Sequence, residues 1–198
     1  MTLAHQGLVV AILAAGEGRR FDGIKQLAPV LGKPLLQHSV DVCRQIPGAR
    51  TLVVLGAHRT RIRAQLDFAG VAVCINAAWR EGMAASIRVA VGAAGPQCRG
   101  LLLLAADQVR VSGDDLARLI AAWRAAPEAI VAAHYMGSPG IPAIFPATCF
   151  ADLLALTGDK GAKPLLLGAG NRLVTVAMPA AALDVDCARD LVEGVIPP

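Results

Sequence analysis

The chain has 198 residues and a mass of 20.4 kDa, a length that fits one domain over residues 1–198. Hydrophobic residues make up 55% of it and charged residues 17%, which excludes a disordered chain. Aromatic residues are only 4%, too few for the stacking platforms of a single-strand nucleic-acid binder. The net charge is +4, and most basic residues are Arg, spread from Arg19 to Arg189 with no run of five like charges. We therefore expect a small polyanionic ligand rather than a nucleic acid.

Membrane and disulfide classes are also excluded. The mean hydropathy is +0.54, but the longest fully apolar runs are short, at residues 8–15 and 101–106. A membrane-spanning helix needs roughly 20 apolar residues, and no basic segment precedes the first run, so we expect neither a membrane span nor a secretory signal. The cysteines are odd in number and none are spaced as a zinc or disulfide motif. A cytoplasmic protein with reduced thiols is the expectation.

Strand and helix signals alternate along the chain. Short apolar runs predict strands at residues 8–13, 51–55, 71–75, 101–105, 130–133, 141–145 and 172–177. Apolar residues at helical spacing, with Ser112 and Asp115 as a capping box, predict helices at 34–44, 59–66, 83–91, 116–123, 149–156, 161–168 and 187–193. Residues 137–142, rich in Gly and Pro, are expected to form a loop. The alternation predicts an α/β fold, a three-layer αβα sandwich around a mostly parallel, Rossmann-like sheet.

The first predicted strand leads into a loop of small residues that ends at Lys25. The segment begins at Leu13 and contains the small residues Ala14, Ala15, Gly16 and Gly18. A dinucleotide fingerprint would need a third glycine where Phe21 stands, and a Walker A loop would need its Lys directly after Gly23. What remains is a loop whose backbone N–H groups approach phosphates, with Arg20 and Lys25 adding positive charge. A plain turn with solvated basic side chains is the alternative.

This loop carries a family resemblance. Residues 13–25 resemble the signature L-A-A-G-x-[SG]-x-R-x-x-x-x-K of nucleotidyltransferases with the molybdenum-cofactor guanylyl- and cytidylyltransferase fold. Residues 25–27 and 32–36 look most like the molybdenum cofactor cytidylyltransferases. The resemblance extends along most of the chain and implies a sheet of the nucleotide-diphospho-sugar transferase type. It also implies CMP transfer from CTP to the phosphate of molybdopterin, Mg²⁺ or Mn²⁺ as the metal, and a molybdenum hydroxylase as client.

A second segment of the chain is similar to the part of the family that contacts the nucleotide. Residues 76–87 resemble its pattern N-x-x-W-x-x-G-M-x-x-S, which implies nucleotide-binding roles for Asn76, Gly82 and Ser86. Gly82 would open a helix whose first N–H groups favour an anion or a nucleotide oxygen. Met83 and Ile87 fit a core role instead.

Two groups of carboxylates are candidate metal ligands. Asp107 directly follows a buried strand, where a carboxylate is costly unless it is paired, hydrated or metal-bound, and residues 106–109 resemble the family's D-[MQ]-P motif. Asp184 and Asp186 resemble the family's D-I-D-T-P-E-D, and alternation in a strand would place both on one face. The resemblance implies Asp107 and Asp186 as metal ligands and Arg20, Lys25 and Asp107 as catalytic residues. A turn or helix-cap role is the alternative for each carboxylate.

Two glycine-rich segments resemble the acceptor side of the family. Residues 137–145 are similar to G-x-x-G-[HN]-P-x-x-F, with Ile141 at the polar position, and residues 156–163 to L-x-G-D-x-G-A-R. They imply an acceptor-phosphate lid that includes Gly140, Pro142, Asp159 and Lys163, against the alternative of loops with solvated charges. For the whole chain, the alternatives are a guanylyltransferase on the same cofactor, a sugar-phosphate nucleotidyltransferase, and a non-catalytic chaperone for the cofactor.

Overall fold

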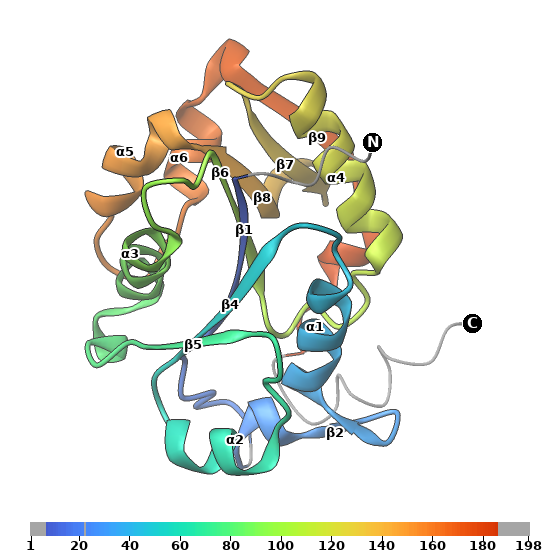
Figure 1. Cartoon of the computed structure of the whole chain (residues 1–198), viewed down its shortest axis with the longest axis vertical. Coiled ribbons are helices and arrows are strands. Elements are labelled where there is room, and N and C mark those ends of the chain that lie inside the picture. The colour runs from blue at the N-terminus through green and yellow to red at the C-terminus, as the bar shows by residue number, and fades with distance from the viewer. Residues whose placement is uncertain (1–6, 22, 186–198) are drawn as a thin grey trace.

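The computed structural model describes residues 7–21 and 23–185 and is built on one large sheet (Figure 1). Its seven strands lie in the order β5-β4-β1-β6-β8-β7-β9. Their bounds are β1 Leu8–Ala14, β4 Arg50–Leu55, β5 Ala72–Ile75, β6 Gly100–Ala105, β7 Ile130–Tyr135, β8 Ser138–Pro146 and β9 Leu173–Ala177. All pairings are parallel except those of β8, which runs antiparallel to both of its neighbours. The prediction of a mostly parallel sheet is confirmed.

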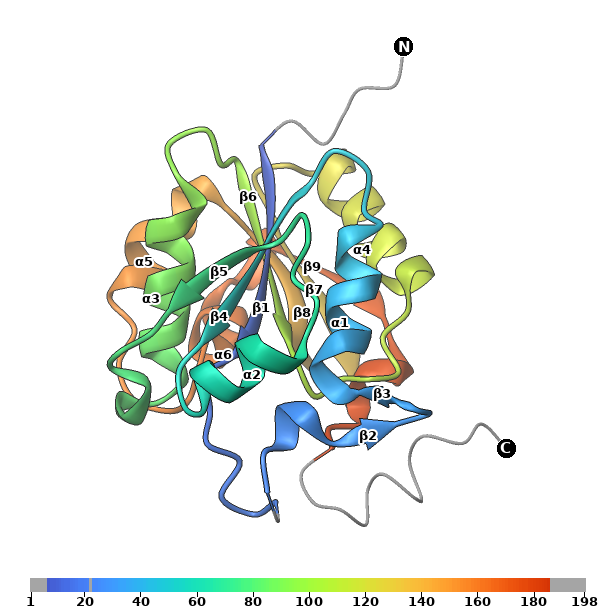
Figure 2. The same ribbon diagram turned by 60° about the horizontal axis from the view of Figure 1, so that its bottom comes forward.

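Helices cover both faces of this sheet (Figure 2). Their bounds are α1 Leu35–Arg44, α2 Arg59–Gln65, α3 Met83–Ala94, α4 Gly113–Ala125, α5 Phe150–Leu154 and α6 Lys163–Gly168. Alternation along β1 sends Val10 and Ile12 to a core shared with α1, α2 and α4. Val9 and Ala11 point to a second core shared with α3, α5 and α6. The structure therefore has the predicted three layers.

Local sequence explains where the helices begin. The Ser112 hydroxyl accepts from the Asp115 N–H, and the Asp115 carboxylate accepts from the Ser112 N–H, so the predicted capping box of α4 is confirmed. Pro34 was expected to open α1 but is its N-cap, because it still belongs to a two-stranded ribbon, β2 (Pro29–Val30) with β3 (Lys33–Pro34). No helix within the described residues is long and apolar enough to cross a membrane.

The loop expected at residues 137–142 is wrong. Only Met136 and Gly137 separate β7 from β8, and both have left-handed backbone angles, with φ of 48° and 73°. Such a pair matches the twist of a tight hairpin. The prolines misled the prediction, because Pro142 lies where the register between β7 and β8 shifts and a strand tolerates proline.

The end of the described chain also differs from expectation. Residues 183–185 form no strand, so the strand alternation invoked for Asp184 does not occur. Val185 instead packs with Val30 and Leu35 in a small third cluster. Asp186 and the helix predicted at 187–193 lie outside the described residues.

Candidate active site

The segments that carry the predicted site meet at the carboxyl ends of β1 and β6. These strands are parallel, so the residues that follow them lie at one edge of the sheet. The segment after β1, residues 15–24, is called the glycine loop below. It folds back on itself: the Phe21 N–H donates to the Gly18 oxygen at 2.8 Å. Gly18 has φ 68°, and an added Cβ would lie 3.0 Å from the Cβ of Lys25. Glycine therefore lets the loop close onto Lys25.

Lys25 and Asp107 form the central ion pair of the site. The Lys25 Nζ lies 2.6 Å from the Asp107 Oδ2, and their side chains are only 13% and 24% exposed. The second oxygen, Asp107 Oδ1, is buried and has no hydrogen-bond partner. A buried carboxylate oxygen without a donor is unfavourable, and a hard divalent cation satisfies such an oxygen. Asp107 thus fits the predicted metal role. In the described part of the chain, however, no three His, Cys, Asp or Glu side chains group around a metal position.

Gln26 was not among the predicted site residues, although it is the side chain that fixes the glycine loop. It is 5% exposed, and its Nε2 donates to the Ala14 oxygen at 3.0 Å and the Gly16 oxygen at 2.8 Å. Gln26 and Lys25 share the short 3-10 helix η1, Lys25–Leu27. The short helix η1 therefore contacts the backbone of the glycine loop through Gln26 and the Asp107 carboxylate through Lys25. A glutamine directly after the signature lysine was the available signal.

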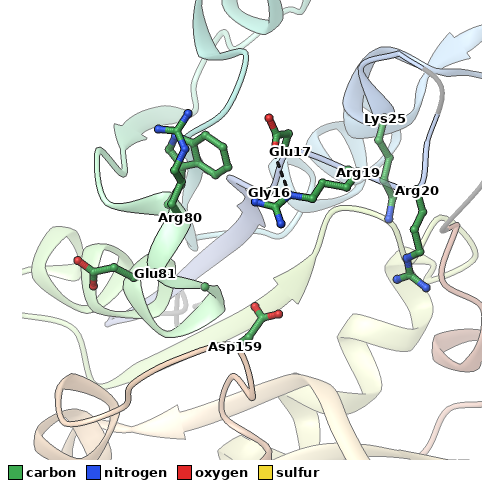
Figure 3. A pocket seen from close by; sticks show the side chains of 11 residues that line it. Gly16, Glu17, Arg19, Arg20, Lys25, Arg80, Glu81 and Asp159 are labelled. Carbon is green, nitrogen blue, oxygen red and sulfur yellow. Dashed lines mark hydrogen bonds and ion pairs between the residues drawn. The ribbon is translucent and has the colours of Figure 1, made fainter.

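Two cavities receive most of the predicted residues, and Figure 3 shows the larger one. The larger, the nucleotide pocket below, has a volume of about 470 Å³, within the range of ligand sites. It is lined by Gly16, Glu17, Gly18, Arg19, Arg20, Lys25, Trp79, Arg80, Glu81, Gly82 and Asp159. The smaller is lined by Leu13, Ala14, Gly16, Gly18, Lys25, Gln26, Leu35, Ala106 and Asp107. The structure thus brings the glycine loop, Gly82 and Asp107 together, as the sequence predicted. Ala15 lines neither cavity, and its oxygen accepts from the Ala57 N–H.

Asn76 and Ser86 stabilise the segment that leads to this pocket without lining it. The Asn76 Nδ2 donates to the Ser86 Oγ at 3.0 Å, and the Asn76 Oδ1 accepts from the Ala78 N–H at 2.9 Å. Both residues are buried, at 1% and 5% exposure, and neither lines the cavities described above. In this structure they shape the turn that leads to Gly82, which has φ 105° and is the N-cap of α3. Direct contact with a nucleotide stays a prediction for these two side chains.

Asp159 lies elsewhere than expected. It was assigned to the acceptor lid, but it lines the nucleotide pocket opposite the glycine loop (Figure 3). Its Oδ1 accepts from the Met83 N–H at 3.2 Å, and the neighbouring Gly158 oxygen accepts from the Ala84 N–H at 3.1 Å. The N-terminus of α3, predicted to face a ligand anion, is therefore already occupied by a carboxylate of the chain.

The other predicted acceptor residues gather at the β7–β8 hairpin. The Lys163 Nζ donates to the Ser138 Oγ and the Pro139 oxygen, both at 2.6 Å. Gly140 leaves room for the hydroxyl of Tyr135, which donates to the Ile141 oxygen at 3.1 Å. Burial raises the pKa of Tyr135, and the negative charges of Asp184 and Asp107 raise it further. The Tyr135 end of the hairpin is therefore within electrostatic reach of Asp107.

Comparison with known proteins agrees with this geometry. A family model described as the MobA-like NTP transferase domain matches residues 10–174. The purine catabolism protein PucB of Bacillus subtilis is 31% identical over 180 residues, which are 82% of this chain and 84% of that protein. The manganese complex of Rv0371c from Mycobacterium tuberculosis is 30% identical with a TM-score of 0.82, covering 97% of this chain and 98% of that one. The nucleotidyl transferase Mth528 from Methanothermobacter has a TM-score of 0.79 over 97% of each chain, but at 22% identity it supports the fold alone.

Proposed function

Because the chain belongs to the family of MobA-like NTP transferase domains, we propose that it transfers CMP from CTP to the phosphate of molybdopterin. Its general activity is that of a nucleotidyltransferase. The observation that carries the proposal is the Lys25–Asp107 pair beside the glycine loop. The Lys25 ammonium can bind a phosphate oxygen, and the Asp107 oxygen without a hydrogen-bond partner can bind the metal ion that accompanies a triphosphate.

The proposed reaction is a substitution at phosphorus. An oxygen of the acceptor phosphate forms a bond to the α-phosphorus of CTP, and the bond from that phosphorus to the bridging oxygen breaks. The bridging oxygen keeps the electron pair and leaves as part of pyrophosphate. The acceptor phosphate is already ionised at neutral pH, so the protein needs no covalent nucleophile. Its task is positioning and charge stabilisation.

The catalytic residues have different tasks in this proposal. Lys25 and Arg20, which both line the nucleotide pocket, neutralise the triphosphate, and Lys25 stabilises the negative charge that grows on the leaving pyrophosphate. Asp107 would hold Mg²⁺ or Mn²⁺, with Asp186 as the proposed second ligand. When bound, the metal would supply positive charge to the phosphate oxygens. Before it binds, the Lys25 ammonium holds Asp107 in place.

Gly140, Pro142 and Lys163 remain the proposed acceptor-binding residues. The support for this is that Lys163 donates to Ser138 and Pro139 of β8, the same strand that contains Gly140 and Pro142. Ile141 lies at the position where the family pattern has a polar side chain, so the acceptor contact there would come from the backbone. The Ile141 oxygen already accepts from Tyr135 and from Gln108.

Base choice is the finest part of the proposal. Support for CTP comes from the Lys25-Gln26-Leu27 continuation, which resembles the cytidylyl branch of the family. Buried donors left unpaired by the wrong base cost about 1–3 kcal/mol each. We expect kcat/KM for CTP to exceed that for GTP by about tenfold or more with the same molybdopterin acceptor. A preference for GTP would leave a nucleotidyltransferase but overturn the cytidylyl assignment.

A cheaper assay separates the alternatives. Pyrophosphate release is measured with each nucleoside triphosphate, with and without molybdopterin and with a sugar phosphate as competing acceptor. Release that depends on molybdopterin supports the proposal, release with the sugar phosphate supports a sugar-phosphate nucleotidyltransferase, and binding without release supports a chaperone. The intact Lys25–Asp107 pair argues against the last.

The proposed setting is the cytoplasm, with a molybdenum hydroxylase as the client that receives the product. The Bacillus subtilis relative is called a purine catabolism protein, and this name favours a client that acts on purines. A pull-down of the loaded protein with a purine-oxidising molybdenum hydroxylase would test it.

A further inference from the structure

Three carboxylates line the nucleotide pocket, and they differ in their partners. Glu17 is paired with Arg19 at 3.1 Å, and Glu81 is paired with Arg88 at 2.5 Å. Asp159 has one oxygen on the Met83 N–H. Within residues 7–21 and 23–185, Asp159 forms no ion pair with a Lys or Arg side chain, whereas Glu17 and Glu81 each do. Asp159 is thus a pocket carboxylate with acceptor capacity left for a ligand.

The position of Asp159 is fixed by its neighbours. The Gly158 oxygen accepts from the Ala84 N–H, and the Arg88 guanidinium donates to the Leu156 oxygen at 2.8 Å. A Cβ on Gly82 would lie 2.7 Å from the Gly158 oxygen, so glycine is required for this close approach. The carboxylate therefore belongs to a built wall of the pocket rather than to a freely moving loop.

The charges around the pocket decide which part of a nucleotide meets Asp159. Arg20 and Lys25 lie together on one side of the cavity, apart from Asp159 (Figure 3). A triphosphate is drawn to this basic side, and a carboxylate repels it. Asp159 is left to face neutral hydrogen-bond donors. The donors that every ribonucleotide offers, whatever its base, are the two hydroxyl groups of the ribose.

We propose that Asp159 accepts a hydrogen bond from a ribose hydroxyl of the bound nucleotide and thereby selects ribonucleotides over deoxyribonucleotides. The inference deepens the proposed function and rests on it for the nucleotide, but not for the acceptor. It assigns to nucleotide selection a residue whose motif resembles the acceptor side of the family. A base amino group is the other neutral donor, and the experiment separates the two.

The test is equilibrium binding with Mg²⁺ present and no acceptor. Titration calorimetry compares CTP, 2′-deoxy-CTP, 3′-deoxy-CTP and UTP on the full chain and on Asp159→Ala and Asp159→Asn. The unchanged protein is expected to bind CTP about tenfold more tightly than at least one deoxy form, the scale of one hydrogen bond to a charged group. In Asp159→Ala that ratio is expected to fall to about threefold or less, mainly through weaker binding of CTP.

Two variants make the result specific. Asp159→Asn keeps an oxygen for the Met83 N–H, so it removes the charge while preserving the contact with α3, and the ratio is expected to fall in it too. Asp152→Asn removes an exposed carboxylate of α5 that does not line the pocket, and it should leave the ratio unchanged. Equal losses for CTP and both deoxy forms would make Asp159 a helix cap only and overturn the proposal. If the substitutions lower only the preference for CTP over UTP, Asp159 contacts the base, and the proposal is overturned as well.

Failure of this inference and failure of the proposed function are distinguishable. Binding needs no molybdopterin, so a wrong acceptor does not affect the ratio. If GTP proves to be the better nucleotide, the same comparison with 2′-deoxy-GTP and 3′-deoxy-GTP answers the question. A protein that binds no ribonucleotide would overturn both.

Discussion

The two halves of the site are built by different means. The nucleotide half consists of the glycine loop, η1 and Asp107, and its contacts are largely buried: Gln26 on the loop carbonyls and Lys25 on Asp107. The proposed acceptor half consists of the β7–β8 hairpin and Lys163, and its main contact, from Lys163 to Ser138 and Pro139, is exposed. Buried polar contacts are strong and rigid, whereas exposed ones are weak and easily exchanged. The first half is preformed for one ligand, and the second is free to adapt to another.

This contrast predicts that changes at the Lys25–Asp107 pair act on catalysis, and that changes in the proposed acceptor half act only on binding of the acceptor. The largest effect is expected at Asp107. Asp107→Ala removes the carboxylate that the proposed metal requires and breaks its ion pair with Lys25. We expect kcat to fall by about a thousandfold, the scale of losing a preorganised charge at a phosphoryl centre.

The measurement for Asp107 is steady-state pyrophosphate release, with circular dichroism to check folding. Asp107→Asn, which keeps the shape of the side chain, should fall almost as far, because an amide is a poor metal ligand compared with a carboxylate. Activity within about tenfold of the unchanged protein, in a folded Asp107→Ala variant, would exclude the metal role.

Lys25→Ala is expected to have the next largest effect, about a hundredfold on kcat with little change in KM for CTP. Negative charge moves onto pyrophosphate only in the transition state, so a cation placed there stabilises that state selectively. Lys33→Ala removes the same charge from a partly exposed side chain outside both cavities and serves as the matched control. If KM alone rises, Lys25 is a binding residue and the nucleotide half lacks the catalytic role assigned to it.

Gln26→Glu tests whether the glycine loop is preformed. The substitution replaces two N–H donors with a carboxylate that faces the oxygens of Ala14 and Gly16 and lies next to Lys25 in sequence. Each lost hydrogen bond is worth about 1 kcal/mol, so we expect KM for CTP to rise by about tenfold or more. Gln45→Glu, at the exposed end of α1, should change nothing. An unchanged KM in folded Gln26→Glu would mean that the loop needs no fixing by this side chain.

The sequence predicted the fold and the placement of the glycine loop beside Asp107, for a physical reason. Strands such as β1 and β6 are buried on both faces, so their apolar runs are visible without knowledge of their neighbours. The glycine loop and Asp107 directly follow those strands, and parallel strands bring their ends together whatever the details of packing. Local pattern and topology were therefore sufficient.

Asp159 and the proposed acceptor half depend on contacts that no local pattern contains. Asp159 reaches an N–H that is 76 residues away in the chain, and Lys163 reaches Ser138 over 25 residues. Gly-rich motifs marked both segments but did not show which partner each would find. Pro142 and Gly140 argued for a loop, although the register shift between β7 and β8 accommodates them within a strand. Pairing across the sheet decided the structure here.

The smallest expected effect lies at Lys163 and bears on the independence of the two halves. Lys163→Met keeps the length of the side chain but loses both hydrogen bonds to the start of β8. Because these bonds are exposed, their net value is about 0.5–1 kcal/mol each, so we expect the KM for molybdopterin to rise by about threefold to tenfold. The KM for CTP should not change, since Lys163 lines neither cavity of the nucleotide half. Lys160→Met is the matched control from the same segment. A parallel rise in both KM values would show that the hairpin also shapes the nucleotide pocket, and the division into a preformed and an adaptable half would then be wrong.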